Sequence, residues 1–429
     1  MNTTLAALQS PLPRMFTVGQ EFPDSSLCNV AEAVQNEIDK IATAIQPGTR
    51  IGIGVGSRGI TNIKTIVQFT VQGLQARGAK PFIIPAMGSH GGASAIAQTE
   101  LLAEYGITEE SMGVPIKATM EVQSVGNTLE GSEVVWALPA TEADAVMVIN
   151  RIKPHTDFSG KIGSGLIKMA VVGLGKRVGA SNFHRAASRN GYETSLRERF
   201  KLLTQATPFI GGLGLVEDQF HQTAHIEWVP SVDAESREEV LFKKASALMP
   251  RIPYESIDLL IVDRIGKNIS GAGMDPNIIG RSIHGYLTSP QENPSKPYIR
   301  RIFVRDLTPE THGNAIGIGL ADMTTRRLVE ATDHEITFLN ALTALSTNGA
   351  KIPIYFDTDK EAIHRVLDTL ALDQADHARI IRIQDTLNLA KIQASEAFFE
   401  ETKNRTDLTV ESPLMPLAFN GEEHLLPFE

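Results

Sequence analysis

The sequence predicts an α/β protein that is divided into two domains with mainly parallel, Rossmann-like sheets. Short apolar segments of strand length alternate with amphipathic segments of helix length along most of the chain, and this alternation is typical of βαβ units. A chain of 429 residues is also long enough for two or three domains. Its 42% hydrophobic and 21% charged residues are those of an ordinary globular protein.

The first βαβ unit follows a segment of loop character at residues 1–30, which contains several prolines. Residues 31–45 have the periodicity of a helix. Residues 49–55 form an apolar run of strand length, residues 61–76 again have helical periodicity, and residues 80–85 form a second strand. Because a strand, a helix and a strand at this spacing make a crossover unit, we expect the two strands to be parallel.

The same alternation continues to the middle of the chain. A strongly apolar strand at residues 143–149 precedes a glycine-dense segment at residues 153–182. The other elements expected in this half are a helix at 95–105, strands at 114–124 and 132–138, and helices at 183–204 and 234–247.

A proline-bounded segment, Met-Pro-Arg-Ile-Pro at residues 249–253, marks the expected domain boundary, because proline stops helices and restricts its neighbours. We therefore expect an N-terminal domain at residues 1–250, a C-terminal α/β domain at residues 251–402 and a surface-wrapping tail at residues 403–429. The elements expected in the C-terminal domain are strands at 257–262, 300–305, 352–356 and 379–383, and helices at 359–370 and 387–401.

The composition excludes several classes of function. Forty Lys and Arg against 50 Asp and Glu give a net charge of −10, which argues against sequence-independent binding to nucleic acid. The single cysteine, Cys28, excludes an intramolecular disulfide framework and cysteine-held metal clusters, and it fits a reducing compartment. The N-terminus lacks a signal-peptide pattern and no run of about 18 apolar residues occurs, so we expect a cytoplasmic protein with no membrane partner.

A glycine-rich turn follows the first strand. Residues 54–59, Gly-Val-Gly-Ser-Arg-Gly, match GxGxxG directly before a helix, where backbone N–H groups and the helix N-terminus attract phosphate. Arg58 could pair with a phosphate or a carboxylate through two nitrogens. The dinucleotide fingerprint also needs an acid after the second strand, and residues 85–88 contain none. The turn therefore favours an anion or mononucleotide phosphate over NAD, and an ordinary tight turn is the alternative.

Two histidines follow strands and are candidates for acid–base chemistry. His90 follows the second strand within Gly-Ser-His-Gly-Gly, and His155 follows the strand at 143–149. Because ligands bind at the carboxyl ends of parallel strands, both histidines could reach one crevice, and imidazole titrates near neutral pH. Arg151 and Lys153 could hold a carboxylate beside them. Loop histidines without a role are the alternative.

A lysine in apolar surroundings follows His155. Lys168 lies within residues 164–173, where desolvation would make its amine more nucleophilic. His184 opens a polar helix and could ligate a metal through a neutral nitrogen. Gly173 begins a second glycine pattern at residues 173–179, and the lack of a ribose-binding acid again argues against NAD.

Together these segments resemble the nickel-dependent lactate racemase family. The resemblance rests on Ser57–Arg58, on Gly88–His90, and on Pro154–His155 with the Phe-Ser-Gly that follows. It rests most on Lys168, followed by Gly173 and then His184. It covers residues 50–190 clearly and the C-terminal α/β domain more loosely.

This resemblance implies two α/β domains with the active site in the cleft between them. It also implies a nickel-pincer nucleotide, a pyridinium-3-thioamide-5-thiocarboxylic acid mononucleotide that grips the metal. Lys168 would carry this cofactor through a thioamide, and His184 would complete the nickel coordination. His90 and His155 would be the acid/base histidines on either side of a 2-hydroxy acid, which is racemised or epimerised by reversible hydride and proton transfer. The cofactor would also be held by Gly56, Ser57, Arg58 and Gly173.

The sequence departs from the family pattern around the substrate. Gly56–Ser57–Arg58 lacks the acid that usually precedes the Thr-Arg of the phosphate loop, and Lys161 is a rival to Lys168 as the attachment site. The substrate-binding Gln and Lys of the second domain have no clean match, so Lys267 and Arg281 join Arg58 as the substrate-binding candidates. We therefore expect a 2-hydroxy acid other than lactate.

Two other functions remain open from the sequence. The first is a lyase or hydrolase for a small carboxylate, with His90, His155 and His184 as direct ligands of zinc or iron. The second is a non-catalytic protein that binds a nucleotide cofactor through its glycine-rich loops. For the racemase, the expected partners are the small 2-hydroxy acid, the cofactor-biosynthesis enzymes and a second copy of the chain in a homodimer.

Overall fold

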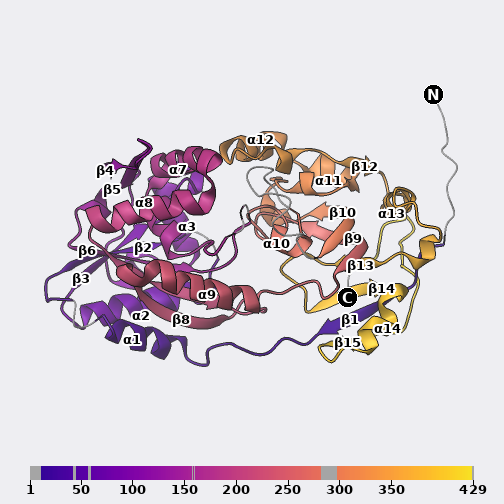
Figure 1. The fold of residues 1–429 in the computed structure, drawn as a ribbon, viewed down its shortest axis with the longest axis horizontal. Coiled ribbons are helices and arrows are strands. Elements are labelled where there is room, and N and C mark those ends of the chain that lie inside the picture. The colour runs from indigo at the N-terminus through magenta and orange to yellow at the C-terminus, as the bar shows by residue number, and fades with distance from the viewer. Residues whose placement is uncertain are drawn as a thin grey trace. The chain divides into compact units, whose positions relative to one another are not determined.

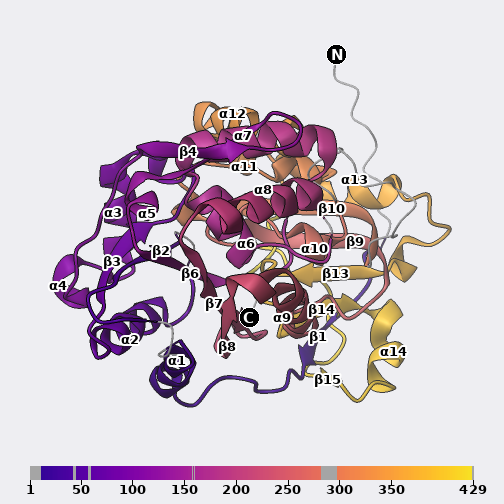
Figure 2. The ribbon, with the colours of Figure 1, turned by 60° about the vertical axis from the view of Figure 1, so that its left-hand side comes forward.

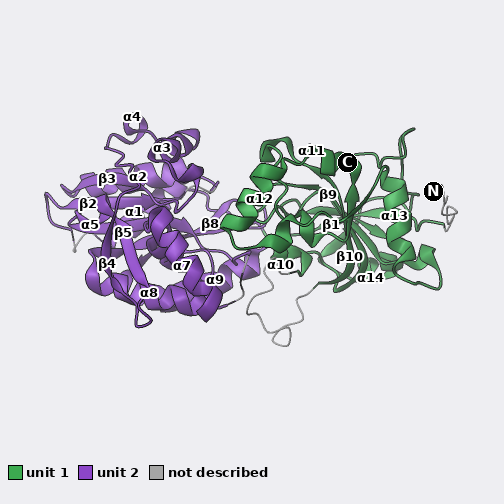
Figure 3. Cartoon of the chain, turned by 90° about the horizontal axis from the view of Figure 1, so that it is seen from above, with its two compact units in different colours: residues 1–23, 250–429 green, residues 24–249 purple. Residues whose placement is uncertain are grey.

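The computed structural model describes residues 11–41, 45–56, 59–156, 158, 160–281 and 297–427. The chain forms two compact units, unit 1 with residues 1–23 and 250–429 and unit 2 with residues 24–249 (Figure 3). Both units are α/β, as predicted. The sequence-based division assigns the first 23 residues to the N-terminal domain and sets the last 27 apart, whereas in the structure both segments belong to unit 1.

Unit 2 is built on a five-stranded sheet in the order β3-β2-β6-β7-β8, in which only β8 is antiparallel to its neighbour (Figure 1). The chain runs from β2 outward to β3 and then returns to β6 on the other side of β2. This reversal is a topological switch point, where open α/β sheets bind ligands. The strands are β2 (Arg50–Val55), β3 (Lys80–Pro85), β6 (Ala145–Arg151), β7 (Phe209–Glu217) and β8 (Thr223–Pro230).

The main core of unit 2 lies between this sheet and the helices α1 (Val30–Asp39) and α2 (Ile63–Gln75). Alternate strand residues such as Ile53 and Met147 face a helical stripe that includes Ile66, as expected for a half-buried sheet face. Figure 2 shows α1 and α2 on one side of the sheet and α7 and α8 on the other. The remaining helices of unit 2 are α3 (Ala95–Glu104), α4 (Glu109–Met112), α5 (Leu138–Thr141), α6 (Leu166–Lys168), α7 (Lys176–Asn190), α8 (Tyr192–Ala206) and α9 (Ala234–Leu248).

Unit 1 contains an eight-stranded sheet in the order β12-β11-β10-β9-β13-β14-β1-β15. The five strands from β12 to β13 are parallel, and the last three pair antiparallel. The strands are β1 (Met15–Gln20), β9 (Ser256–Ile265), β10 (Tyr298–Leu307), β11 (Met323–Thr325), β12 (Ile354–Phe356), β13 (Ile380–Ile383), β14 (Lys391–Ser395) and β15 (Leu408–Val410). The helices are α10 (Pro276–Ile279), α11 (Arg326–Ala331), α12 (His334–Thr343), α13 (Asp359–Asp368) and α14 (Phe399–Lys403).

A buried ionic network joins the sheet of unit 1 to the end of the chain. Arg305 on β10 lies 2.9 Å from the Asp263 carboxylate and 2.8 Å from that of Asp359. Arg382 on β13 pairs with Asp263 at 2.7 Å. The backbone N–H of Leu425 donates to Asp359 at 2.9 Å, and its carbonyl accepts from Arg305 at 2.9 Å. The tail is therefore held against the sheet by charged groups rather than lying loosely on the surface.

Several expected elements differ from the observed ones. The helix expected at residues 183–204 is two helices, α7 and α8, which meet at Gly191 with a φ of 84°. The helix expected at 387–401 is wrong, because β14 and then α14 occupy that stretch. Strands β1, β7, β11 and β15 were not expected, and the hairpin of β4 (Val122–Asn127) and β5 (Glu133–Ala137) begins later than predicted. Among the described residues, no helix combines the length and apolar character needed to cross a membrane.

Candidate active site

The candidate histidines of unit 2 lie at the carboxyl edge of its parallel strands. His90 follows β3 and His155 follows β6, and these two strands flank β2 in the sheet. Two strand spacings put the carboxyl ends of β3 and β6 roughly 10 Å apart. The His90 side chain is exposed, whereas His155 is buried. His155 therefore lies at the switch point between β2 and β6, and His90 lies one strand away at the same edge of the sheet, which is where a ligand is expected.

Lys168 contacts His155 directly. The Lys168 Nζ is hydrogen-bonded to His155 Nε2, and the lysine side chain is half-buried at the end of α6. Lys161, its rival in the sequence, has an exposed side chain, and its backbone N–H donates to the Glu193 carboxylate at 2.8 Å. The structure thus brings Lys168 to the candidate acid/base group.

Two aromatic rings connect His155 with His184. The Phe158 ring stacks on His155 with a centroid distance of 4.6 Å, and Tyr192 stacks on Phe158 at 4.6 Å. The Tyr192 hydroxyl lies 2.8 Å from Nδ1 of His184 on α7. Sequence reasoning missed Tyr192, because it begins the next helix after the break at Gly191. With Lys168, these four side chains form what we call the His155–His184 cluster.

Close packing on glycines sets the position of the segment that carries Lys168. This segment, α6 and the π-helical turn Met169–Gly173, packs on the sheet face opposite the main core. A Cβ at Gly173 would lie 2.7 Å from the Ala86 carbonyl oxygen, and a Cβ at Gly56 would lie 2.6 Å from Met169 Cε. Gly56 and Gly173, which the sequence suggested as cofactor contacts, therefore allow this segment to approach the carboxyl ends of β2 and β3.

A buried carboxyl group on α9 contacts the segment that carries Lys168. Glu238 on α9 accepts a hydrogen bond from the Ile167 N–H at 2.9 Å. Burial raises the pKa of the Glu238 carboxyl to about 7, against the opposing effect of the Ile167 and Leu166 N–H groups. Its Oε1 has no hydrogen-bond partner among the residues that the structure describes. Nothing in the local sequence of α9 distinguishes this glutamate from its exposed neighbours.

A buried lysine holds the loop that carries His90. Lys176 Nζ donates to the Pro85 carbonyl at 2.5 Å and to Gln98 Oε1 at 3.2 Å. The Gln98 amide in turn donates to the carbonyl oxygens of Gly88 and His90, both at 3.1 Å. Burial lowers the pKa of Lys176 to about 8. The sequence placed Lys176 in a glycine pattern, but its contact with Gln98 comes from the tertiary fold.

Other sequence-based candidates have different surroundings. Ser57 and Arg58, together with Ser159 of the Phe-Ser-Gly motif, lie outside the described residues. Arg151 forms an ion pair with Glu217, whose carboxylate also accepts from the Thr61 N–H at 2.9 Å. The positive charge of Arg151 is therefore already compensated within unit 2.

The two candidates in unit 1 lie at opposite edges of its parallel strands. Lys267 follows β9 at the carboxyl edge, and its Nζ donates to the Gly271 carbonyl at 2.9 Å. Arg281 pairs with Asp322, just before β11, at 2.6 Å and donates to the Leu320 carbonyl at 2.6 Å. The structure therefore does not bring Lys267 and Arg281 together.

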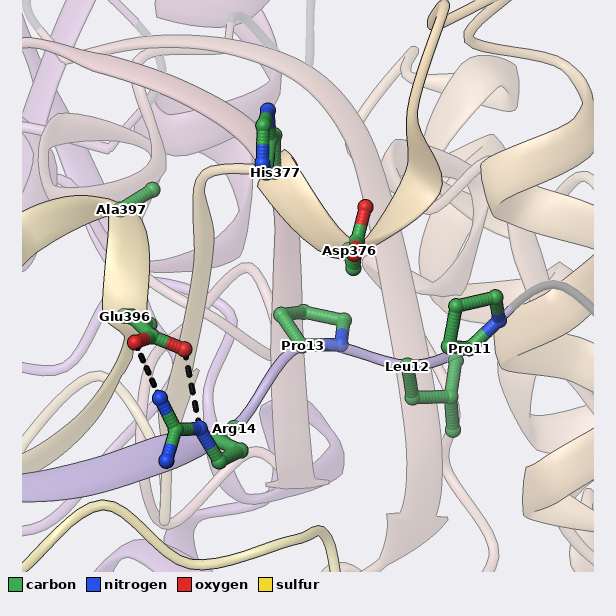
Figure 4. Close-up of a pocket in the computed structure, with 8 residues that line it drawn as sticks. All are labelled: Pro11, Leu12, Pro13, Arg14, Asp376, His377, Glu396 and Ala397. Carbon is green, nitrogen blue, oxygen red and sulfur yellow. Dashed lines mark hydrogen bonds and ion pairs between the residues drawn. The ribbon is translucent and has the colours of Figure 1, made fainter.

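Two further observations concern possible ligand sites in the described part of the chain. No three side chains of His, Cys, Asp or Glu come close enough there to hold a metal ion, so His90, His155 and His184 do not form a three-histidine site in this structure. A cavity of about 430 Å³ in unit 1 contains none of the candidate residues (Figure 4). It is lined by Pro11, Leu12, Pro13, Arg14, Asp376, His377, Glu396 and Ala397.

Comparison with known proteins identifies the fold of this chain. No protein-family model matches the sequence, and no curated protein matches it either. The chain is similar to the lactate racemase apoprotein from Thermoanaerobacterium thermosaccharolyticum, with a TM-score of 0.53 and 13% identity over 87% of this chain and 99% of that one. It is also similar to a protein from Thermotoga maritima, with a TM-score of 0.49 and 12% identity over 77% and 83% of the two chains. The chain therefore has the fold of the lactate racemase apoprotein.

Proposed function

We propose that this protein is a racemase or epimerase of a 2-hydroxy acid and uses a lysine-tethered nickel-pincer nucleotide. The observation that carries the proposal is the contact of Lys168 with His155, in a cluster that also includes His184. A nucleophilic amine, an acid/base imidazole and a nitrogen ligand are thus gathered at the switch point of one sheet. The shared fold with the lactate racemase apoprotein supports the same conclusion.

The residues of unit 2 fit this cofactor by type. Lys168 would carry it through a thioamide, and His184 would supply one nitrogen ligand to nickel. The sulfur ligands would belong to the cofactor itself, because Cys28, the only cysteine, is exposed just before α1. Gly56, Ser57, Arg58 and Gly173 are the proposed contacts to the rest of the nucleotide. When bound, the cofactor supplies a carbon that accepts and returns hydride.

His90 and His155 would then move the proton of the substrate hydroxyl. Their positions after β3 and β6, on either side of β2, support the proposal that the two imidazoles approach a substrate from opposite sides. One neutral imidazole would accept the hydroxyl proton while the carbon that bears this hydroxyl gives up its hydride. After hydride has returned to the opposite face of the same carbon, the other imidazole, in its protonated form, would give a proton to the oxygen. The burial of His155 against the Phe158 ring keeps water from that side.

The proposal also covers the residues that bind the substrate, the protein partners and the alternative metal site. Arg58 and Lys267 remain the proposed substrate-binding cations, whereas Arg281 is paired with Asp322 at the opposite edge of the strands. We also propose cofactor-biosynthesis enzymes as partners and a homodimer as the assembly. The zinc or iron alternative gains no support from the separation of His90, His155 and His184.

The test is to produce the protein together with the cofactor-synthesis enzymes. Intact-mass spectrometry and metal analysis should find one nickel and one covalent adduct, and Lys168→Ala should abolish the adduct whereas Lys161→Ala should keep it. The loaded protein should racemise at least one member of a panel of 2-hydroxy acids, and His90→Ala should lower that turnover more than 100-fold with nickel retained. An adduct that survives Lys168→Ala, or stoichiometric zinc without an organic adduct, would refute the proposal.

A further inference from the structure

We propose that His155 and Lys168 form an acylation dyad, in which His155 is the base that allows Lys168 to attack an activated acyl or thioacyl carbon. The site would therefore have an activity of its own, the acylation of its lysine, before any turnover of substrate. The inference rests on the proposed function only for the natural acyl donor, which would be a thioacyl derivative of the cofactor. The acylation itself needs only the two side chains.

Direct contact between the two reacting nitrogens is the first observation. Lys168 Nζ and His155 Nε2 are hydrogen-bonded, so a proton can pass between them without an intervening water. His155 is buried, and the stacked Phe158 ring fixes the plane of its imidazole. A fixed imidazole beside a nucleophile is the arrangement that activates serine and cysteine in other enzymes.

The surroundings of Lys168 supply the second observation. Its neighbours Ile167 and Met169 are buried, whereas the Lys168 side chain is only half-buried. The Lys168 side chain is therefore partly accessible to a reagent from outside, whereas the segment on either side of it is fixed in the core. At pH 7 an ordinary lysine with a pKa near 10.4 is a neutral nucleophile in only about one molecule in 2,500. His155 speeds the reaction of this neutral fraction, because it takes the proton that Nζ loses as the new bond forms.

The step is balanced without an oxidant or reductant. The lone pair of Lys168 Nζ forms a C–N bond with the carbon of a thioester, and the proton that Nζ loses passes to His155 Nε2. The C–S bond breaks, and the departing thiolate takes the proton from His155, so that the products are an amide and a thiol. With a thioacyl donor that bears a leaving group, the same step gives the thioamide.

Acylation of Lys168 also makes His155 available for proton transfer with the substrate. An amide or thioamide nitrogen is not basic, so the acylated Lys168 no longer exchanges a proton with Nε2. The same imidazole then becomes available to the hydroxyl of the substrate. A single histidine would thus serve first in loading the cofactor and afterwards in turnover.

The experiment uses the full-length apoprotein and the phenyl thioester of pyridine-3-carboxylic acid as the acyl donor, at pH 7. Peptide mass spectrometry follows each lysine with time. We expect Lys168 to be acylated at least 10-fold faster than Lys161, which is exposed and close in the sequence. His155→Gln should slow acylation of Lys168 by 10- to 100-fold and leave the rate at Lys161 unchanged.

A rescue experiment separates the base from a packing effect. His155→Ala opens space beside Lys168, and added imidazole should restore a large part of the lost rate at Lys168 only. The thermal unfolding temperature of each variant reports whether it is folded. Equal rates at Lys168 and Lys161 in the wild type, or an unchanged rate at Lys168 in a folded His155→Gln variant, would overturn the dyad.

The outcomes also separate this inference from the proposed function. Rapid, His155-dependent acylation in a protein that never acquires nickel would support the dyad and refute the racemase. A nickel-loaded racemase whose apoprotein shows no selective reaction at Lys168 would refute the dyad and leave the racemase standing.

Discussion

The contact between Tyr192 and His184 bears on which nitrogen of His184 would bind the proposed nickel. A neutral imidazole carries a proton on only one nitrogen, and the Tyr192 hydroxyl is bonded to Nδ1 at 2.8 Å. When Nδ1–H donates to the tyrosine oxygen, Nε2 is the nitrogen without a proton and would be the one to act as a ligand. Because the ring of Tyr192 is buried and stacked on Phe158, its hydroxyl is held in position.

Tyr192→Phe should therefore weaken metal binding without disturbing the stack. The variant keeps the ring and loses only the oxygen, so we expect the cofactor-loaded protein to hold nickel 10- to 100-fold less tightly, as for other outer partners of ligating histidines. Competition with a metal chelator, followed by metal analysis of the protein, measures the change. Tyr298→Phe, at a tyrosine that is 65% exposed in unit 1, is the matched control. Equal affinity in Tyr192→Phe and the wild type would contradict the assignment.

Some residues of the candidate site could be predicted from the local sequence, and others could not. His90, His155 and Lys168 stand out because their types and their places after strands already indicate chemistry. Tyr192 and Glu238 do not, since each reaches the site through a contact that only the tertiary fold creates.

At the scale of elements, α9 supports α6 through a single buried carboxyl. Glu238 occupies a site that raises its pKa from 4.5 to about 7. A carboxyl with a raised pKa binds its proton more tightly in the folded chain than in the unfolded one. The free energy of unfolding should therefore decrease as the pH rises from about 4.5 through 7, by at most about 3 kcal/mol.

Glu238→Gln should remove this loss of stability. The amide oxygen can still accept from the Ile167 N–H, and it carries no charge at any pH. We expect the variant to gain stability relative to the wild type between pH 5 and pH 8, measured by urea unfolding at both values. Glu239→Gln, at a partly exposed neighbour paired with Arg197, should leave the pH dependence in place. An unchanged pH dependence in Glu238→Gln would show that the carboxyl is not responsible.

The elements that were predicted correctly are those whose pattern is local. The strands at 49–55 and 80–85 and the helix between them are apolar or amphipathic over their whole length, and all three are found. By contrast, residues 391–395 become a strand only by pairing with β13 and β1. A partner about 375 residues away in the sequence leaves no trace in the local periodicity, so a helix was expected there.

At the scale of the whole molecule, the described tail is an integral part of unit 1. Asp359, at the start of α13, is fully buried and receives hydrogen bonds from Arg305 and from the Leu425 N–H. The ionic network thus ties β10, α13 and the end of the chain into one structure. Composition alone suggested only that residues 403–429 are polar and cover the surface.

Asp359→Asn should destabilise unit 1 and release the tail. Removal of the Asp359 charge from this buried network leaves Arg305 and Arg382 to share the carboxylate of Asp263, at a cost of about 3–5 kcal/mol. Urea unfolding measures the loss, and hydrogen exchange should show faster exchange at residues 419–427. Asp357→Asn is the control, because Asp357 is two-thirds exposed in its pair with Arg326, and we expect a change below about 1 kcal/mol there. Similar losses in both variants would contradict the proposed role of the network.

The pairing of β1 with β14 sets the order in which the protein can fold during synthesis. Met15 pairs with Ser395, so the ribosome must add about 380 residues before the strand near the N-terminus meets this partner. At 5–20 residues per second this takes roughly 20 to 75 s. Unit 2 lies wholly between β1 and β14 in the sequence. It therefore emerges first and can fold while both edges of β1 are still unpaired. Chaperones that bind extended strands therefore have their longest opportunity at residues 15–20.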